Sequence, residues 1–200
     1  MAIGRDGWVV CSVLAVGAAV PRLSGIQARE VGSPASTQTD VAPDAAATSA
    51  AVDTRGAWPR VHIPDPLAAQ GLRAALDRAW TVLADPRCSR VLRDFSDQSG
   101  QSLESRLASL RAPVQQYLTQ LVFIDDSRSR TCVTRIIGFT QPGSRVVRVC
   151  VDEFKRTWRQ DQQHTVAALI HEMLHTLGLG ENPPSPHEIT KRVRSACGGR

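Results

Sequence analysis

A long stretch of this chain, residues 29–57, contains no aromatic residue, no Leu and no Ile. Ala, Ser, Thr, Asp and Pro dominate it, and such a composition cannot bury enough apolar surface to offset the conformational entropy lost on ordering. We therefore predict a disordered linker over residues 26–57. A folded domain must then be built from residues 58–200, a length that suits one domain.

Composition limits the class of this domain. Aromatic residues make up only 4% of the chain, so its core must be built mainly from Leu, Val, Ile and Ala. With 42% hydrophobic and 22% charged residues, the chain is not a collagen, a coiled-coil rod or a polytopic membrane protein. The formal net charge is +5, and the positive excess lies in residues 58–200. This charge mildly favours acidic partners but lacks the dense basic stripe of a nucleic-acid-binding protein.

The first residues have the pattern of an export signal. Arg5 lies in a short polar start, and an uncharged apolar run follows over residues 8–20. A helix over that run would be about 20 Å long, against roughly 30 Å for the hydrocarbon core of a membrane. A cleaved signal peptide over residues 1–25 is therefore favoured over an uncleaved anchor, and we expect a secreted or periplasmic protein.

Residues 58–200 contain four cysteines: Cys88, Cys132, Cys150 and Cys197. An even number in an exported chain suggests two disulfides. We favour Cys132 with Cys150 and Cys88 with Cys197. The first bond needs a wide loop or staggered strands, because a tight turn near residue 142 would set Cys132 opposite residue 153. A zinc–cysteine site is the alternative, but the sequence has no C-x-x-C spacing.

Apolar periodicity in this domain predicts helices mixed with strands. Asp65 is a capping residue followed by proline, and Leu and Trp then recur at helical spacing up to residue 85. Segments rich in Val, Ile and Phe are separated by turn residues and read as strands. We predict helices over 65–85, 102–110 and 114–120, and strands over 121–124, 132–139 and 145–151.

The most informative segment runs from Asp161 to Gly178. Asp161 can cap the start of a helix, Gly178 can end it, and apolar residues recur between them at helical spacing. Within this predicted helix, His171 and His175 are four residues apart. Both imidazoles therefore project from the same face, about 6 Å apart.

Two histidines so arranged can bind one zinc ion, each at about 2.0–2.1 Å. Glu172 follows the first of them but lies about 100° further round the helix, so its carboxylate can hold a zinc-bound water without binding the metal. We expect Zn²⁺ on His171 and His175, with Glu172 as the catalytic residue. Catalytic zinc usually has three protein ligands, so a third is needed.

Glu181 is the favoured third ligand, because Gly178 allows a sharp turn and Glu181 is the next charged side chain. Glu188 is the alternative. In a competing interpretation, Ser185 and Glu188 form a capping box that begins a last helix over about 186–196.

Other candidates are weaker. His164 lies about 10.5 Å along the helix axis from His171 and cannot share its ion, so we interpret it as a first-turn or cleft-rim residue. His187 is a further candidate ligand, although a surface position at the start of the last helix is the simpler account. We interpret Tyr117 as a core residue and not as an oxyanion donor, and His62 as a surface residue.

The run His171-Glu172-x-x-His175-x-x-Gly178-x-x-Glu181 resembles the zincins, and in particular the metzincin pattern H-E-x-x-H-x-x-G-x-x-H/D. It departs from that pattern in its last residue, although a carboxylate oxygen is an acceptable zinc donor. The methionine turn of the metzincins is also missing, since the only methionines are residues 1 and 173. The chain is most similar to small secreted bacterial zincins of the form H-E-x-L-H-x-L-G-L-x-E-N-P-P.

The pattern of helices and strands predicts an α+β fold, with a small antiparallel or mixed sheet and a C-terminal helix tied by the Cys88–Cys197 bond. The resemblance implies that this fold is a minimal zincin-like domain with an active-site helix. It implies hydrolysis of peptide bonds by a zinc-activated water that loses its proton to Glu172. It also implies that a strand edge aligns the substrate as an added strand, for which residues 145–151 are the candidate.

We therefore expect a protein or peptide substrate as partner, no nucleic acid, no stable membrane partner after signal cleavage, and a monomer. The alternative of a different class is a non-catalytic secreted binding module whose metal is structural or absent.

Overall fold

The computed structural model describes residues 58–198, so the predicted signal peptide and linker lie outside the described residues. Helix α1 (Pro66–Leu83) begins where the sequence predicts it. The Asp65 carboxylate accepts hydrogen bonds from the backbone N–H groups of Leu67 and Ala68, at 3.0 and 3.1 Å. One face of the helix is buried through residues that include Leu72 and Leu76. Capping and apolar spacing thus fix both the start of α1 and its buried side.

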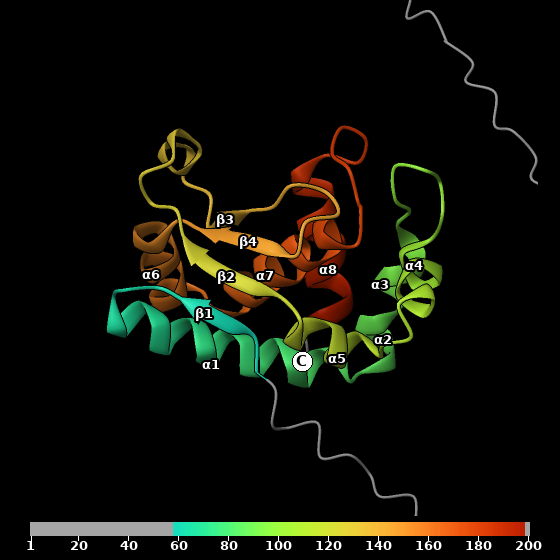
Figure 1. The fold of residues 1–200 in the computed structure, drawn as a ribbon, viewed down its shortest axis with the longest axis horizontal. Coiled ribbons are helices and arrows are strands. Elements are labelled where there is room, and N and C mark those ends of the chain that lie inside the picture. The colour runs from blue at the N-terminus through green and yellow to red at the C-terminus, as the bar shows by residue number, and fades with distance from the viewer. Residues whose placement is uncertain (1–57, 199–200) are drawn as a thin grey trace, which may run out of the picture. The chain divides into compact units, whose positions relative to one another are not determined.

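A four-stranded mixed sheet forms the other main layer (Figure 1). Its strands, in spatial order, are β1 (Arg60–His62), β2 (Val122–Asp125), β4 (Val146–Val149) and β3 (Gly138–Phe139). The first three are parallel and β3 is antiparallel to β4. Phe123 and Val147 are buried neighbours in the two central strands. The predicted α+β class with a small mixed sheet is confirmed.

Helix α7 (Gln162–Thr176) is the central helix of the fold. It contacts α1, β3, β4, α6 (Val151–Gln160) and α8 (Pro186–Cys197). Most of its residues are buried, from Thr165 to Thr176, including both histidines of the motif. A helix packed on so many sides holds its side chains in fixed positions, which suits a site that must be pre-organised.

Short helices complete the domain and gather on the right of Figure 1. They are α2 (Pro86–Ser89), α3 (Val91–Asp94), α4 (Leu103–Ser109) and α5 (Val114–Thr119). The predicted disulfide between Cys88 and Cys197 is present and joins α2 to α8 across 109 residues of sequence. The predicted disulfide-tied C-terminal helix is therefore confirmed. No helix of the described residues is long and apolar enough to cross a membrane.

The strand predicted over 132–139 is mostly wrong. Only Gly138–Phe139 pairs with β4, while Arg130–Thr134 forms the 3-10 helix η2. Arg135 follows with a φ of 62°, in the left-handed region, and reverses the chain. This reversal brings Cys132 back over the end of β4, where it forms the predicted bond with Cys150. The wide connection that this disulfide requires is thus supplied by a helical turn and not by staggered strands.

Four other elements were not predicted. Helix α6 begins directly after β4, β1 precedes α1, and α2 with α3 follows it. Val151, Phe154 and Trp158 have the spacing of an amphipathic helix and could have revealed α6. Strand β1 is too short to leave a periodic signal.

Asp65 makes a second contact, with Lys155, and this contact makes the stability of the fold depend on pH. Lys155 Nζ on α6 lies 2.8 Å from its Oδ2 atom. This hydrogen bond, together with the backbone donor of Ala68, lowers the pKa of Asp65 below its ordinary value. A carboxyl with a depressed pKa in the folded state stabilises the fold above its unfolded pKa of about 3.9, and this contribution is lost as pH falls through the folded pKa.

We expect Asp65→Asn to lower the free energy of unfolding at pH 7, and the deficit to shrink as the pH approaches 3. Asn retains an oxygen for the helix cap but has no charge for Lys155. Urea unfolding at pH 7, 5 and 3 measures this difference. Asp77→Asn, the same change at an exposed position of α1, is the control and should show no such trend. A deficit for Asp65→Asn that stays constant with pH would contradict the prediction.

Candidate metal centre

Helix α7 carries His171, Glu172 and His175, and specific contacts fix where this helix begins and ends. At its start, the Asp161 carboxylate accepts the backbone N–H of His164 at 2.8 Å. At its end, Gly178 has a φ of 107°, which side-chain-bearing residues rarely adopt, and a Cβ there would lie 3.1 Å from Asp97 Cβ. The helix therefore stops at Thr176, and the chain turns sharply toward Glu181.

Three side chains converge after this turn. His171 Nε2 lies 2.8 Å from His175 Nε2, and Glu181 Oε1 lies 3.2 Å from His175 Nε2 and 3.6 Å from His171 Nε2. The two imidazoles are buried, while the Glu181 side chain is 41% exposed. Their ligand atoms all lie within 4.8 Å of one another, so this group could hold a metal ion. These are the three residues that the sequence pattern favours.

The other nitrogen of each imidazole has its own partner. His175 Nδ1 donates to the carbonyl oxygen of Leu179 at 2.7 Å, because a carbonyl can only accept. The neutral ring then has its lone pair on Nε2, which faces the other two ligand atoms. We call His171, His175 and Glu181 together the metal group. His171 Nδ1 lies 2.8 Å from Thr190 Oγ1 on α8. The orientation of both rings is thus fixed from outside the group.

Burial keeps His171 in the form that binds metals. It lowers the pKa of this imidazole to about 3, and the neighbouring His175 adds to the effect. Metal ions bind the neutral imidazole and compete with protons for it. At neutral pH the His171 ring therefore needs no deprotonation before it can act as a ligand.

Glu172 lies beside this group. Burial raises its pKa to about 7; a side-chain hydrogen bond with Thr140 works against this rise, and the carboxylate of Glu181 adds to it. Its Oε2 atom is buried without a hydrogen-bond partner of standard geometry among the described residues. A carboxyl in this state can take up or release a proton near neutral pH, as a general acid or base must.

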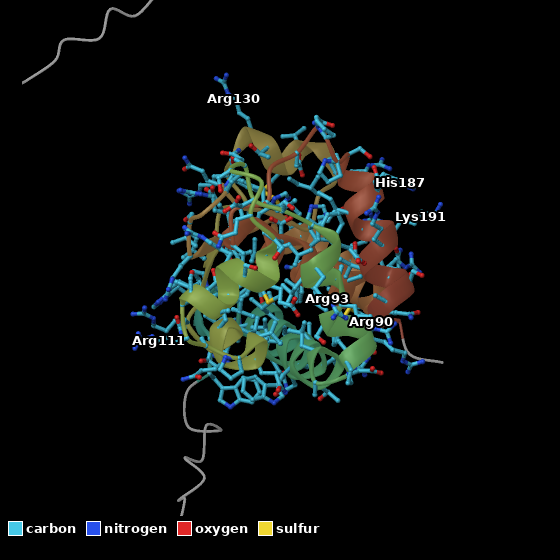
Figure 2. The ribbon with its side chains drawn as sticks, turned by 90° about the vertical axis from the view of Figure 1, so that its right-hand side faces the viewer. Arg90, Arg93, Arg111, Arg130, His187 and Lys191 are labelled. Carbon is cyan, nitrogen blue, oxygen red and sulfur yellow. A yellow bond between two sulfur atoms is a disulfide. The ribbon has the colours of Figure 1, made fainter. Side chains whose placement is uncertain are left out.

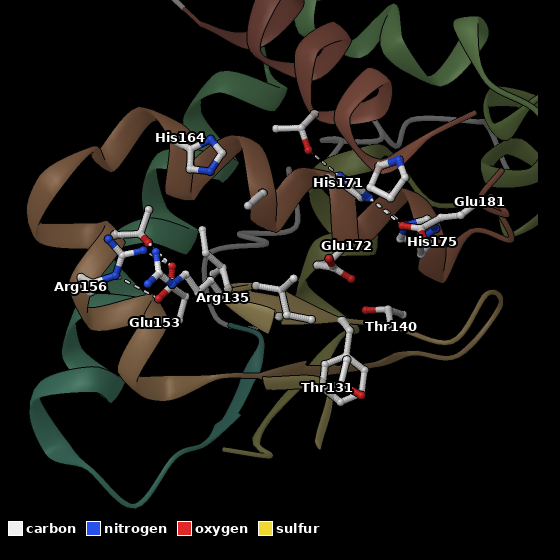
Figure 3. Close-up of a pocket in the computed structure, with 18 of the residues that line it drawn as sticks. Thr131, Arg135, Thr140, Glu153, Arg156, His164, His171, Glu172, His175 and Glu181 are labelled. Carbon is white, nitrogen blue, oxygen red and sulfur yellow. Dashed lines mark hydrogen bonds and ion pairs between the residues drawn. The ribbon is translucent and has the colours of Figure 1, made fainter. Parts of the chain in front are cut away.

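A cavity of about 760 Å³ opens along the metal group, a size typical of substrate clefts (Figure 3). The metal group and Glu172 lie at one end, and Arg135, Glu153 and Arg156 lie at the other. Among residues 58–198, three buried side-chain atoms lack a hydrogen-bond partner of standard geometry: Thr140 Oγ1, His164 Nδ1 and Glu172 Oε2. All three residues line this cavity. Thr140 and Glu172 face each other across the cavity wall (Figure 3), and a side-chain hydrogen bond between them lowers the pKa of Glu172 against the effect of burial.

The strand beside the cavity is β3 and not β4. Residues 145–151 were the predicted substrate-aligning edge, but β4 pairs with β2 on one side, and on the other side β3 covers its residues Arg148 and Val149. Strand β3 ends the sheet, and its residues Gly138 and Phe139 line the cavity. In the strand order β1-β2-β4-β3 the edge strands are β1 and β3, and of these two only β3 contributes residues to the cavity lining.

The remaining candidates lie elsewhere. The Glu188 side chain pairs with Arg192, and its backbone N–H donates to Ser185 Oγ at 3.2 Å, as expected for the start of the last helix. His187 is exposed and points away from the ribbon (Figure 2). Tyr117 is buried, and its hydroxyl donates to Thr176 Oγ1 at 2.9 Å, so it is a core residue.

His164 lines the cavity, which agrees with its interpretation as a cleft residue. His62 is an exposed residue of β1. Sequence reasoning missed Thr190, Thr140 and Arg135. None of them belongs to a recognisable motif, and only the packing of α8, β3 and η2 around α7 brings them to the site.

The loop between β3 and β4 also touches the end of α7. The backbone N–H of Gly143 donates to the carbonyl oxygen of His175 at 2.8 Å. The same carbonyl also accepts the backbone N–H of Gly178 at 2.9 Å, so the bond from Gly143 is a second one, and it ties the loop after β3 to the end of α7. No family model, curated protein or solved structure matches this chain, so the site is described from the structure of this chain alone.

Proposed function

We propose that this chain is a secreted zinc-dependent endopeptidase that uses Glu172 as its general base. The observation that carries the proposal is the unpartnered, buried carboxylate oxygen of Glu172 beside two histidines and a glutamate that could hold a metal ion. The motif's resemblance to the zincins supports the same reading. Two disulfides support export, because such bonds persist in oxidising compartments.

The ligand set fits zinc. Two imidazoles and one carboxylate are a common set for catalytic zinc, which leaves the fourth position free. Ligand atoms at about 2.05 Å from one ion, in tetrahedral geometry, lie about 3.3 Å from one another. The separations of 2.8, 3.2 and 3.6 Å between the three ligand atoms bracket this value. The separation that differs most from this value is the 2.8 Å between the two imidazole nitrogens, so binding of an ion would require the two rings to move slightly apart.

In the proposed mechanism a bound zinc ion supplies Lewis acidity that lowers the pKa of water toward 7 and polarises the substrate carbonyl. Glu172 takes a proton from the attacking water and passes it to the leaving amine. Burial raises the pKa of this carboxyl to about 7, which suits a group that takes up and releases a proton near neutral pH. Strand β3 aligns the peptide, since an extended substrate can add to its free edge.

The test uses the purified full chain. We expect about one zinc ion per chain and cleavage of an unstructured protein substrate, with the cleavage lost on chelation and restored by zinc. Bound zinc is measured by elemental analysis and cleavage by mass spectrometry of the products. Zinc without hydrolysis would favour a binding module with a structural metal. A chain that binds no metal would refute both the site and the proposed activity.

A further inference from the structure

The end of the cavity away from the metal group has a polar character of its own. His164 Nδ1 is buried there without a partner, while its backbone N–H is used in the helix cap. His164 and His171 are seven residues apart on α7, which corresponds to about 10.5 Å along the axis. An extended peptide covers that distance in about three residues. A substrate residue three positions from the scissile bond would therefore reach His164.

The charged side chains at this end of the cavity are not all paired with one another. Glu153 forms an ion pair with Arg156, whose Nε lies 3.0 Å from its Oε2. Asp161 is taken by the N–H of His164 and by Arg194 Nη2 at 3.5 Å. Arg135 lines the same end and has no ion pair or hydrogen bond among the described residues. One positive charge is therefore left over for a ligand.

The backbone segment that carries Arg135 is held in place at both of its ends. Its left-handed backbone follows η2, and Cys132, three residues earlier, is bonded to Cys150. Two residues later, the carbonyl of Ile137 accepts the backbone N–H of Cys150 at 2.9 Å. The short segment that carries Arg135 is thus fixed to the start of α6 at two points. A guanidinium on a fixed support loses less entropy when it binds a carboxylate.

We propose that Arg135 and His164 form a subsite for an acidic side chain, Asp or Glu, about three residues from the scissile bond. The proposal rests on the proposed function and adds to it a substrate class, peptides with an acidic residue at that position. The guanidinium of Arg135 donates to the carboxylate, and His164, which lines the same end of the cavity, forms part of the wall of the subsite.

The test compares two series of peptides on the zinc-loaded full chain. One series has Glu at successive positions on both sides of the cleaved bond, and the other has Gln at the same positions. We expect the Glu/Gln ratio of kcat/KM to reach about 10 at one position, about three residues from the cleaved bond, as one charge-assisted hydrogen bond provides. Arg135→Gln should bring this ratio to about 1, His164→Asn should lower it, and Arg135→Lys should retain part of it.

Arg130→Gln is the matched control. Arg130 lies in the same segment, has the same charge and projects away from the molecule (Figure 2), and it is not among the residues that line the cavity. This variant should keep the wild-type ratio. Because each ratio is measured within one variant, differences in zinc content or stability between variants cancel.

Peptide binding, measured apart from hydrolysis, distinguishes the proposed subsite from the proposed peptidase activity. The dissociation constants of the Glu and Gln peptides are measured on wild-type protein and on Glu172→Gln. Tighter binding of the Glu peptide that depends on Arg135, without hydrolysis by the wild type, would support the subsite and refute the peptidase. Hydrolysis with equal use of Glu and Gln peptides would overturn the subsite alone. A preference that survives in Arg135→Gln would overturn it as well.

Discussion

Glu172→Gln is expected to lower kcat for peptide hydrolysis by about 10²–10⁴-fold, the usual contribution of a general base, with zinc still bound. Gln has nearly the same shape as Glu but cannot accept a proton from water. The substitution also removes a carboxyl whose charged form is disfavoured by burial, so it should not weaken the fold. The loss would therefore belong to the chemistry and not to the metal or to folding.

Single-turnover rates, zinc content and thermal stability are measured on the same preparations. Glu104→Gln is the control, since Glu104 is an exposed residue of α4 far from the cavity lining. It should match the wild type in all three measurements. Equal rates for Glu172→Gln and the wild type would show that another group removes the proton, and the assignment of Glu172 would be wrong.

Glu181→Ala is expected to weaken zinc binding by more than the roughly 10–100-fold that outer hydrogen-bond partners of metal ligands contribute. The reason is the direct approach of its Oε1 atom to both imidazoles, at 3.2 and 3.6 Å. Since its side chain is 41% exposed, its removal leaves no buried cavity. Competition with a chromophoric chelator measures the zinc affinity.

Glu188→Ala is the matched control for this measurement. Its carboxylate pairs with Arg192 on the surface of α8, so we expect a zinc affinity equal to that of the wild type. The opposite pattern, with Glu188→Ala weakened and Glu181→Ala unchanged, would make Glu188 the third ligand. Circular dichroism of both variants checks that the last helix is retained.

The centre of the site could be predicted because its chemistry is local in sequence. A capping aspartate, an apolar stripe and a glycine define α7, and helical spacing alone puts His171 and His175 on one face. Glu181 follows within six residues, after a turn that Gly178 allows. Both disulfides could be predicted for another reason, since four cysteines allow only three pairings.

The surroundings of the site could not be predicted, because they depend on tertiary packing. Thr190 meets His171 only because α8 folds back along α7. Residues 132–139 are apolar enough for a strand, but the segment leaves the sheet before Gly138 and coils into η2. The choice of β3 as the free edge depends on the order of the strands, and no residue pattern encodes that order.

The Cys88–Cys197 bond has a consequence for the survival of the domain when its own backbone is cut. It closes a covalent loop that contains the sheet strands β2, β4 and β3, the whole of α7 and Glu181. One cut in any surface loop between residues 88 and 197 therefore leaves both pieces joined. A nicked molecule would keep its metal ligands in one covalent unit, and it would migrate as a single species on a gel until the disulfide is reduced.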